Sequence, residues 1–332
     1  MTLPFSVLDL APIVEGSSIS DAFKNSRSLA IQAEQSGYKR VWLAEHHGMH
    51  GVASSATAVV LGHIGASTSK IRIGSGGVML PNHSPLVIAE QFGTLATLFP
   101  DRVDLGLGRA PGTDMATARA LRRHLHSEVD NYPQDMRELQ YYFGSQQAGK
   151  NVIAVPGTNT HVPIWLLGSS LYSAKLSGQI GLPYSFASHF APEQLFDAIS
   201  LYRATFQASE QAQSPYIMAG VMAVVADTDE EAQYLFTSVQ QQFMNIRRGV
   251  NRPFARPIDD ISSVCTDADL AMLAHILRYA VVGSKQTVTD KLTQFIDATQ
   301  IDELIVSMPI HDVQARLKSL TMLADTGLMA AC

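Results

Sequence analysis

Short apolar runs alternate with longer amphipathic stretches from one end of the chain to the other. The apolar runs are rich in β-branched residues, which predicts strands, and the stretches between them have the periodicity of helices. This alternation is the βαβ pattern of a parallel sheet. The expected strands are Phe5–Leu10, Arg40–Ala44, Ile71–Gly77, Arg102–Leu107, Ile164–Leu167, Tyr184–Ala187, Ile217–Ala226 and Glu303–Ser307. Eight such runs favour a closed (β/α)8 barrel over an open sheet.

Amphipathic patterns predict a helix after several of these strands. The first helix covers Asp21–Ser36, with Ser20 as its N-cap and Gly37 as its end. Further helices are expected at Pro85–Leu98, Thr113–Arg123, Gln134–Phe143 and Ala174–Gln179. Since barrels of this kind commonly run to about 250 residues and beyond, we expect residues 1–332 to form a single domain.

The regular spacing breaks between the seventh and eighth predicted strands, where a long stretch intervenes. This part contains the sequence NRPFARPIDDISS, whose prolines and polar residues exclude a continuous helix. We expect residues 249–285 to be an insertion within the barrel domain. An excursion beside the carboxyl ends of barrel strands would serve as a lid, although a plain surface loop has the same sequence pattern.

Composition narrows the class of partner. The net charge of -6 is modest and no lysine-rich or arginine-rich run occurs, so neither nucleic acid nor an anionic membrane is an expected partner. The two cysteines, Cys265 and Cys332, exclude a disulfide framework and a thiolate metal cluster. The first residues lack a basic leader, and no apolar run approaches the ~20 residues that span a bilayer. These features predict a cytoplasmic protein that acts on a small molecule.

Glycines and polar residues follow the predicted strands, where a barrel carries its functional side chains. In the stretch IRIGSGGVMLPNHSP, a β-branched strand runs into three glycines. Glycines in a strand mark a bulge or a ligand against the main chain, and an ordinary turn has the same pattern. The strand ends of interest are Glu45–Gly48, Gly74–Gly77, Gly106–Arg109 and Gly168–Ser170.

The sequence GSSLYS, from Gly168 to Ser173, leads from a predicted buried strand into a helix. Its amides and hydroxyls would face the positive end of that helix, where a phosphate binds well. Plain N-capping by serine gives the same pattern. A Walker loop is excluded because no Gly-Lys-Ser/Thr sequence follows.

Arg109 follows the sequence GLG at another strand end. Its guanidinium group can pair with a phosphate or a polar ring edge, or with Asp104 or Asp114 in a structural ion pair. The segment is not a dinucleotide fingerprint, because Pro111 stands at the position of the third glycine and no acidic strand end follows at the right distance.

Histidines near the strand ends raise a metal site as an alternative. His46, His47 and His50 follow the second strand, His189 follows the sixth and Asp312 follows the eighth. Metal-dependent barrel hydrolases hold their ligands at such places. Those hydrolases usually carry a His-x-His pair after the first strand, which here ends in the sequence LDL. We therefore expect no metal site, and a metal-dependent hydrolase is the last of the alternatives.

Taken together, the chain resembles the bacterial luciferase-like family of flavin-dependent monooxygenases. The resemblance covers nearly the whole chain and rests on the motifs WLAEHH, IRIGSGGVMLPNHSP, LFPDRVDLGLGRAPGTD and LLGSSLYSAKLSGQIGLPYSFA. It is greatest to the subgroup of luciferase-like oxidoreductases whose substrate is unassigned. This resemblance implies a (β/α)8 barrel that binds reduced FMN at its C-terminal mouth.

The resemblance also implies roles for single residues. His46 would be the active-site histidine beside the reactive part of the flavin, and Gly76–Gly77 would form a non-prolyl cis peptide under the ring. Luciferase itself has a cysteine in place of Gly108 and a glutamate in place of Ser169, so light emission is not expected. The other cofactor-binding residues that the family implies are Asn82, Arg109, Ser169, Ser170, Tyr172 and Ser173.

The implied reaction uses reduced FMN and O2 to transfer one oxygen atom to a small organic substrate, with His46 as general base or hydrogen-bond partner. Because the sequence has no NAD(P)H fingerprint, a separate flavin reductase is expected. The family also implies a homodimer packed through the early barrel helices. The alternatives are an F420-dependent oxidoreductase and a flavin-binding protein without turnover. Insertion residues such as Phe254, Ile258 and Met272 would line a pocket for a hydrophobic or aldehyde-like substrate.

Overall fold

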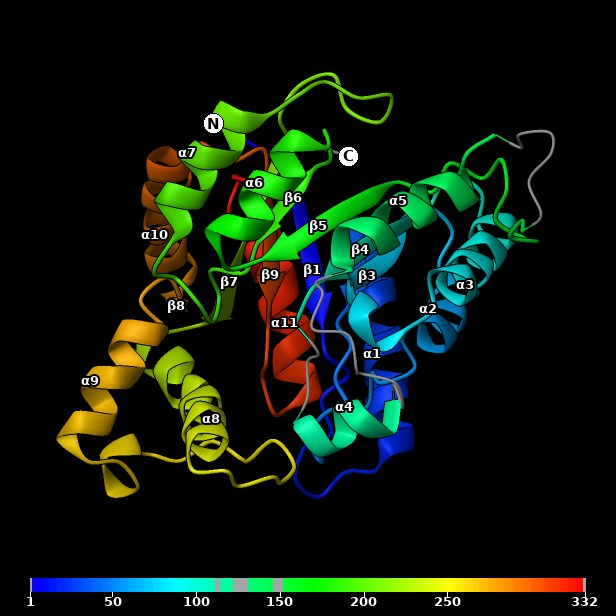
Figure 1. Cartoon of the computed structure of the whole chain (residues 1–332). Helices are drawn as coiled ribbons and strands as arrows, with labels where there is room; N and C mark the ends of the chain where they lie inside the picture. Colours follow the sequence, from blue (N-terminus) through cyan, green and yellow to red (C-terminus); the bar gives the residue numbers. More distant parts are fainter. Residues whose placement is uncertain (1, 111–113, 122–130, 146–151, 331–332) are drawn as a thin grey trace.

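The computed structural model describes residues 2–110, 114–121, 131–145 and 152–330. Parallel strands form its centre, and helices pack around them (Figure 1). The strands are β1 (Phe5–Asp9), β2 (Arg40–Leu43), β3 (Arg72–Met79), β4 (Val103–Gly108), β5 (Ile164–Gly168), β6 (Tyr184–Phe186), β7 (Ile217–Ala226), β8 (Val281–Ser284) and β9 (Glu303–Ser307). Each of the eight runs expected from the sequence overlaps one of these strands, which confirms that part of the prediction.

The strands close into a ring because β6 pairs with β7. The order around the ring is β1, β2, β3, β4, β5, β6, β7 and β9, and β9 returns to pair with β1. Strand β8 lies outside the ring and pairs with the last residues of β7, Ala223–Ala226. The predicted (β/α)8 barrel is confirmed, but the sequence interpretation missed β8, which lies inside the expected insertion.

Helices connect the strands and cover the outside of the ring. They are α1 (Ile19–Gln35), α2 (Thr57–Gly65), α3 (Pro85–Leu98), α4 (Met115–Leu121), α5 (Tyr132–Phe143), α6 (Leu171–Gln179), α7 (Leu195–Thr205), α8 (Asp229–Arg247), α9 (Asp267–Ile276), α10 (Lys285–Thr299) and α11 (Val313–Ala324), with the 3-10 turns η1 (Leu80–Asn82) and η2 (Ile261–Ser263).

The predicted start of α1 is wrong, and the predicted ends of the helix that corresponds to α4 fall outside the described residues. The N-cap of α1 is Ser18 and not Ser20, because the side chains of Ser18 and Asp21 complete a capping box. The helix expected at Thr113–Arg123 corresponds to α4. Its expected ends, residues 113, 122 and 123, lie outside the described residues.

Two apolar layers hold the barrel together. The larger layer lies between the strands and the helices and includes the fully buried Phe5 and Phe92. Trp42 and Trp165 belong to the smaller layer inside the ring, where their rings meet edge to face with centroids 5.2 Å apart. The interior beneath the mouth is therefore a packed core and not a channel.

Charged side chains fill the ring at the amino ends of the strands. Nη1 of Arg40 lies 2.6 Å from the Asp104 carboxylate, and its Nε lies 2.7 Å from the Glu303 carboxylate. Arg72 binds Asp104 from the other side at 2.6 Å. Burial alone would lower the pKa of Arg40, but the two carboxylates outweigh burial and raise it. These buried charges are therefore matched by opposite charges, as burial demands.

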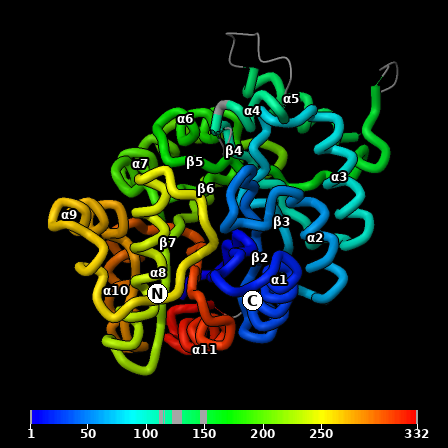
Figure 2. Tube along the Cα trace, turned by 90° about the horizontal axis from the view of Figure 1, so that it is seen from below, coloured from blue at the N-terminus to red at the C-terminus, as the bar shows by residue number. Residues whose placement is uncertain are grey.

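The expected insertion, residues 249–285, contains irregular chain, η2, α9 and β8. Its irregular part runs beside the loops that follow β1 and β2, at the end of the barrel that Figure 2 faces. Phe254 exchanges backbone hydrogen bonds with Ile13 and Glu15, and the side chain of Asn251 bonds the carbonyl oxygen of Gly48. The segment thus reaches the carboxyl ends of the strands, and its role as a lid stays a prediction.

Apolar residues of this segment pack among themselves and against the barrel. Phe254 is buried in a cluster with Val14, Met222 and Leu273, and Met272 packs against that cluster. These contacts hold the segment in place. They also show that Phe254 and Met272, expected to line a pocket, contribute to a hydrophobic core.

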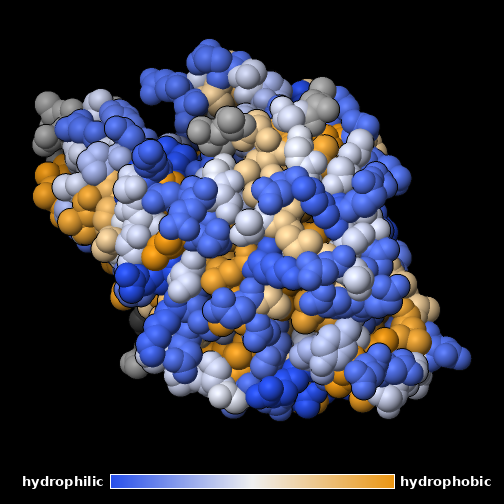
Figure 3. All heavy atoms as spheres, turned by 180° about the vertical axis from the view of Figure 1, so that it is seen from behind, coloured by the Kyte–Doolittle hydropathy of each residue, from blue (hydrophilic) through white to orange (hydrophobic). Residues whose placement is uncertain are grey.

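The outer surface of the molecule is mainly polar on the face shown in Figure 3. Seen from behind, mostly hydrophilic side chains cover the molecule, and the hydrophobic ones lie in separate groups (Figure 3). Among the described residues, no helix is long and apolar enough to cross a membrane.

Candidate active site

Four of the strand ends singled out in the sequence are neighbours, because β2, β3, β4 and β5 follow one another around the ring. Their carboxyl ends therefore lie along one side of the mouth. Arg109, directly after β4, contacts Tyr172 in the first turn of α6, with the guanidinium carbon 4.1 Å from the centroid of the tyrosine ring. The fold thus brings together two of the predicted cofactor-binding residues.

One of the structural ion pairs considered for Arg109 is wrong. Asp104 lies near the opposite end of β4, where it binds Arg40 and Arg72. The Asp114 carboxylate accepts hydrogen bonds from the backbone amides of Ala116 and Thr117 at the start of α4. Pro111, which excluded a dinucleotide fingerprint, lies outside the described residues.

The bare end of β3 results from close packing against the barrel interior. A Cβ on Gly74 would lie 2.7 Å from Nε1 of Trp42, and a Cβ on Gly76 would lie 2.7 Å from Cδ1 of Leu8. Real Cβ atoms essentially never make such contacts, so a side chain at either position would force its neighbours to move. Gly76 is nevertheless only half-buried, which leaves part of its backbone accessible.

The neighbouring positions Gly77 and Gly106 also have no room for a side chain. The peptide bond between Gly76 and Gly77 is cis, which confirms the prediction of its geometry. A Cβ on Gly77 would lie 2.6 Å from the carbonyl oxygen of Gly106, and a Cβ on Gly106 would lie 2.3 Å from the carbonyl oxygen of Ser75. The backbones of β3 and β4 therefore pack closely at these glycines, and Gly76 is the one of the three that is partly exposed.

The buried carboxylate of Glu45 joins the loop after β2 to the loop after β3. It accepts hydrogen bonds from Nε2 of His47 at 2.7 Å, Nε2 of His83 at 2.8 Å and the backbone amide of Met79 at 3.1 Å. Burial raises the pKa of Glu45, but the bonds from His83, His47 and Met79 outweigh it and lower the pKa below its usual value. We call Glu45, His47 and His83 the carboxylate clamp, and it fixes the chain on both sides of His46.

Sequence reasoning missed the carboxylate clamp. Its members lie in the motifs WLAEHH and LPNHSP, so the residue types were visible, but their contact was not. The same three side chains offer metal-ligand atoms within 4.8 Å of one another, a set of ligand types found in zinc sites. In the structure both imidazoles instead bond the Glu45 carboxylate.

The metal site considered from the strand ends is not assembled as expected. Asp312 caps α11 by accepting a hydrogen bond from the backbone amide of Ala315. The backbone amide of His50 bonds the side chain of Asn251. Within the described chain, the grouped metal-ligand atoms are those of the carboxylate clamp, which joins His47 of the considered set to Glu45 and His83.

Helix α6 begins directly after Gly168–Ser170, as the sequence predicted. Ser170 occupies the N-cap, but its side chain makes no capping hydrogen bond within the described structure. The Ser170 hydroxyl therefore does not satisfy the amides of the first turn, and the positive end of a helix favours an anion. Ser169 lies half-buried beside Ser170.

Ser173 and Asn82, two of the predicted cofactor-binding residues, are buried. The Ser173 hydroxyl donates to the carbonyl oxygen of Ser170 at 2.9 Å and lies 3.2 Å from the hydroxyl oxygen of Tyr184. Ser173 therefore braces the turn into α6. Asn82, in η1, is only 9% exposed, and it precedes His83 of the carboxylate clamp.

Two histidines enter the mouth from opposite sides. His46 follows β2 and His189 follows β6, and these strands lie across the ring from each other. Burial, and after it the neighbouring His46, lowers the pKa of His189 to about 4. The sequence interpretation considered His189 only as a metal ligand, whereas the structure places it beside the predicted active-site histidine.

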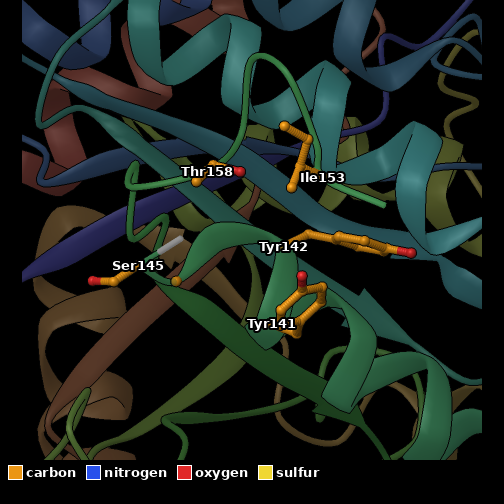
Figure 4. Close-up of a pocket in the computed structure, with 6 residues that line it drawn as sticks. Tyr141, Tyr142, Ser145, Ile153 and Thr158 are labelled. Carbon is orange, nitrogen blue, oxygen red and sulfur yellow. The ribbon is translucent and has the colours of Figure 1, made fainter. Parts of the chain in front are cut away.

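Of two cavities lined by described residues, one lies at the candidate active site. One of about 90 Å³ adjoins the carboxylate clamp and is lined by residues that include Thr57, Val78 and Gln91. The other, of about 10 Å³, lies where α5 ends and the chain turns back towards β5. Figure 4 shows it with Tyr141 and Tyr142 of α5 at its wall. Since it lies at the amino end of β5, it is not part of the candidate active site.

A closed parallel barrel with histidines, glycines and the start of a helix gathered at the carboxyl ends of its strands has the architecture common among enzymes. The sequence model of the luciferase-like monooxygenases matches residues 3–301. The chain belongs to the luciferase-like monooxygenase family.

Characterised and uncharacterised relatives match over almost their whole length. A luciferase-like monooxygenase of Escherichia coli K12 is 49% identical over 324 residues, which cover 98% of this chain and 97% of that protein. The N-acetyl-S-alkylcysteine monooxygenase of Bacillus subtilis is 30% identical over 334 residues, with 98% of each chain covered. The family and these relatives support an oxidoreductase of the monooxygenase type.

Solved structures share the fold. The protein MsnO8 is 32% identical and superposes with a TM-score of 0.87 over 99% of this chain and 100% of its own. The oxygenating component of 3,6-diketocamphane monooxygenase from Pseudomonas putida, solved with FMN, has a TM-score of 0.75 at 18% identity, with 100% and 99% coverage. An F420-dependent secondary alcohol dehydrogenase has a TM-score of 0.69 at 15% identity, with 99% and 100% coverage. The last two show the fold alone.

Proposed function

We propose that this protein is an FMN-dependent monooxygenase that uses reduced FMN and O2 to oxygenate a small organic substrate. One observation carries the proposal: the start of α6, which has no side-chain cap and carries the Arg109–Tyr172 contact, follows β5 on the side of the mouth where β3 and β4 end in glycines. A phosphate and a flat ring fit these two places. Membership of the luciferase-like monooxygenase family supplies the reaction type.

The residues present fit the phosphate of FMN. The amides at the start of α6 and the hydroxyls of Ser169 and Ser170 can donate to its oxygens, and the Arg109 guanidinium can offset its charge. Tyr172 holds the guanidinium group by a cation–π contact. Ser173 acts through the turn that it braces.

Gly76, Gly77 and Asn82 would hold the flavin ring. When bound and reduced, FMN supplies the electrons that activate O2. His46 would hold or accept a proton at the reacting atoms, since imidazole exchanges protons near neutral pH. The carboxylate clamp ties the backbone on both sides of His46 to the loop after β3. The His46 imidazole therefore keeps one position relative to Gly76 and Gly77.

F420 is the competing cofactor, because proteins of this fold include an F420-dependent alcohol dehydrogenase. F420 carries a longer acidic tail than FMN, which would favour further basic residues at the mouth. In the four strand-end segments, Arg109 is the one arginine and no lysine occurs. This charge balance favours FMN.

Anaerobic titration of the purified chain with photoreduced FMN and with reduced F420 tests the choice of cofactor. We expect reduced FMN to bind at least ten times more tightly. Admission of 18O2 to the loaded protein with a library of aldehydes, ketones and thioethers should then place one 18O atom in a product. Tighter binding of F420, or oxidation of bound FMN without any labelled product, would contradict the proposal.

We also propose that a separate reductase supplies reduced FMN, and that the chain forms a homodimer. The purified full chain should therefore oxidise NADPH no faster than a protein-free control containing FMN. Large apolar side chains are exposed on the early helices, among them Val59 of α2 at 74% and Leu98 of α3 at 62%. Sedimentation of the wild type and of Val59→Glu should give a dimer and a monomer respectively.

A further inference from the structure

The carboxylate clamp gathers three metal-ligating side chains around one oxygen atom. Nε2 of His47 lies 2.7 Å, and Nε2 of His83 lies 2.8 Å, from the same atom, Oε1 of Glu45. The ligand atoms of these side chains all lie within 4.8 Å of one another. Bonds of about 2.0–2.1 Å place the ligand atoms of a tetrahedral zinc site roughly 3.3 Å apart. Shifts of roughly half an ångström therefore make room for an ion among the three atoms.

The Glu45 carboxylate is buried without a permanent cation beside it. Only 1% of the residue is exposed. Within the described residues its partners are the two imidazoles and the backbone amide of Met79, and no lysine or arginine pairs with it. The buried Asp104, by contrast, pairs with Arg40 and Arg72. A buried charge costs free energy unless it is paired or coordinates a metal, so Glu45 needs a positive charge from a protonated imidazole or from a metal ion.

The three side chains also select the kind of ion. Two imidazoles and one carboxylate are a set of protein ligands that zinc enzymes use, whereas Mg²⁺ and Ca²⁺ prefer oxygen ligands. The amide of Met79 bonds Oε2 of Glu45 at 3.1 Å, which fixes the carboxylate while Oε1 faces both imidazoles. Outer hydrogen bonds of this kind orient the ligands in metal sites. The clamp therefore matches Zn²⁺.

The cavity of about 90 Å³ beside the clamp has room for a further ligand. Glu45 and His83 form part of its wall, together with residues from the first two turns of α2 and α3. Val78, also in the wall, belongs to the apolar layer between the strands and the helices. The cavity thus lies on the helix side of β3 and not inside the ring. A water molecule needs about 10–15 Å³ of such space, and Thr57 and Gln91 contribute polar side chains to the wall.

We propose that Glu45, His47 and His83 bind one Zn²⁺ ion, with a water molecule from the adjoining cavity as the fourth ligand. One carboxylate oxygen and the two Nε2 atoms would hold the ion, and each imidazole would carry its proton on Nδ1. The ion would neutralise the buried carboxylate and tie the loop after β2 to the loop after β3. This site shares only His47 with the set of strand-end residues considered from the sequence. The inference does not depend on the proposed oxygenase function.

Titration of the metal-stripped, tag-free full chain with Zn²⁺ against a chromophoric chelator tests the proposal. Wild type should bind one Zn²⁺ per chain with a Kd below about 1 μM. His83→Ala should weaken this binding by at least about 100-fold, since loss of even an outer-shell partner costs about 10–100-fold. His50→Ala is the matched control, because it removes an exposed histidine of the loop after β2, and it should keep the wild-type affinity. Absence of one-to-one binding in wild type, equal affinity in His83→Ala, or a loss in His50→Ala would overturn the proposal.

Two measurements on the wild type alone keep the proposal falsifiable if His83→Ala folds poorly. X-ray absorption of the zinc-loaded protein should show four ligands at about 2.0–2.1 Å, two of them imidazoles, and six oxygen ligands would overturn the site. In long-range 1H–15N spectra of histidine-labelled protein, Zn²⁺ should shift the Nε2 signals of two histidines, and a shift of none or of many would also overturn it. Titration of the same protein with reduced FMN tests the proposed function separately, so either can fail without the other.

Discussion

At the amino end of the barrel Arg40 lies within 2.7 Å of two carboxylates, whereas at the carboxyl end Nδ1 of His189 has no partner among the described residues. The amino end has charged side chains that satisfy one another. The carboxyl end has a helix start without a side-chain cap, strand-end glycines and a histidine whose Nδ1 lacks a partner among the described residues. The same ring of strands therefore carries matched charges at one end and the proposed ligand site at the other.

The largest effect that we expect from this contrast is on the chemistry of the mouth. His46→Ala should slow oxygen transfer by about 10²–10⁴-fold, the usual contribution of a general acid or base. Its affinity for reduced FMN should change less than threefold, and its free energy of unfolding by less than about 1 kcal/mol. Single-turnover kinetics, FMN titration and urea denaturation measure the three quantities. Equal losses of rate and FMN affinity would assign His46 a structural role.

The reverse pattern is expected at the amino end. Arg40→Leu leaves the buried carboxylates of Asp104 and Glu303 short of a cation, so it should destabilise the protein by about 3–5 kcal/mol. The folded fraction should still bind reduced FMN with wild-type affinity. As a control, Lys24→Ala removes an exposed ion pair with Asp21 and should cost less than about 1 kcal/mol. Similar losses for both variants in urea denaturation would show that the buried network adds little.

The barrel was predictable because its strands are apolar, β-branched and punctuated by glycine. Strand β8 was not, since the short sequence VVGS lies within a polar insertion and gains its strand character from pairing with β7. The cap of α1 was misplaced although the signal was present: Ser18 precedes Asp21 by the three residues that a capping box requires.

Candidate site residues that directly follow a strand could be predicted from the sequence. Candidate site residues that depend on contacts between distant positions could not. Arg109 and the turn into α6 could be found from the barrel rule alone. The bond between Glu45 and His83 joins residues 38 positions apart, and the room that Gly220 leaves for His189 depends on the packing of two strands. Neither spacing has a sequence signature, because tertiary packing alone creates it.

The pH dependence of stability should distinguish the two ends further. His189 has a pKa lowered to about 4 from an ordinary value of 6.5. The unfolded chain therefore takes up a proton as the pH falls through 6.5, while the folded chain does not until about pH 4, so stability is lost across that window. Between pH 8 and pH 5 this loss should amount to roughly 2 kcal/mol.

His189→Gln should abolish that part of the pH dependence, because glutamine does not titrate in this range. Urea denaturation at pH 8 and pH 5 compares the wild type with the variant, and His63→Gln controls for loss of an exposed histidine. If wild type and His189→Gln lose the same stability between the two pH values, the imidazole is not held neutral in the mouth.

The smallest expected effect is that of replacing Ser170, which tests whether the start of α6 is a ligand site or an ordinary helix cap. Ser170 makes no capping bond, so Ser170→Ala should change the free energy of unfolding by less than about 0.5 kcal/mol. It should weaken binding of reduced FMN roughly tenfold, or about 1.4 kcal/mol, and leave riboflavin, which lacks the phosphate, unaffected. Ser18→Ala is the matched control, because Ser18 does cap α1: it should cost about 1 kcal/mol of stability and leave FMN binding unchanged. If Ser170→Ala is destabilised and binds FMN with wild-type affinity, Ser170 is an ordinary helix cap and not part of a phosphate site. The contrast between the two ends of the barrel would then depend on the glycines and His189 alone.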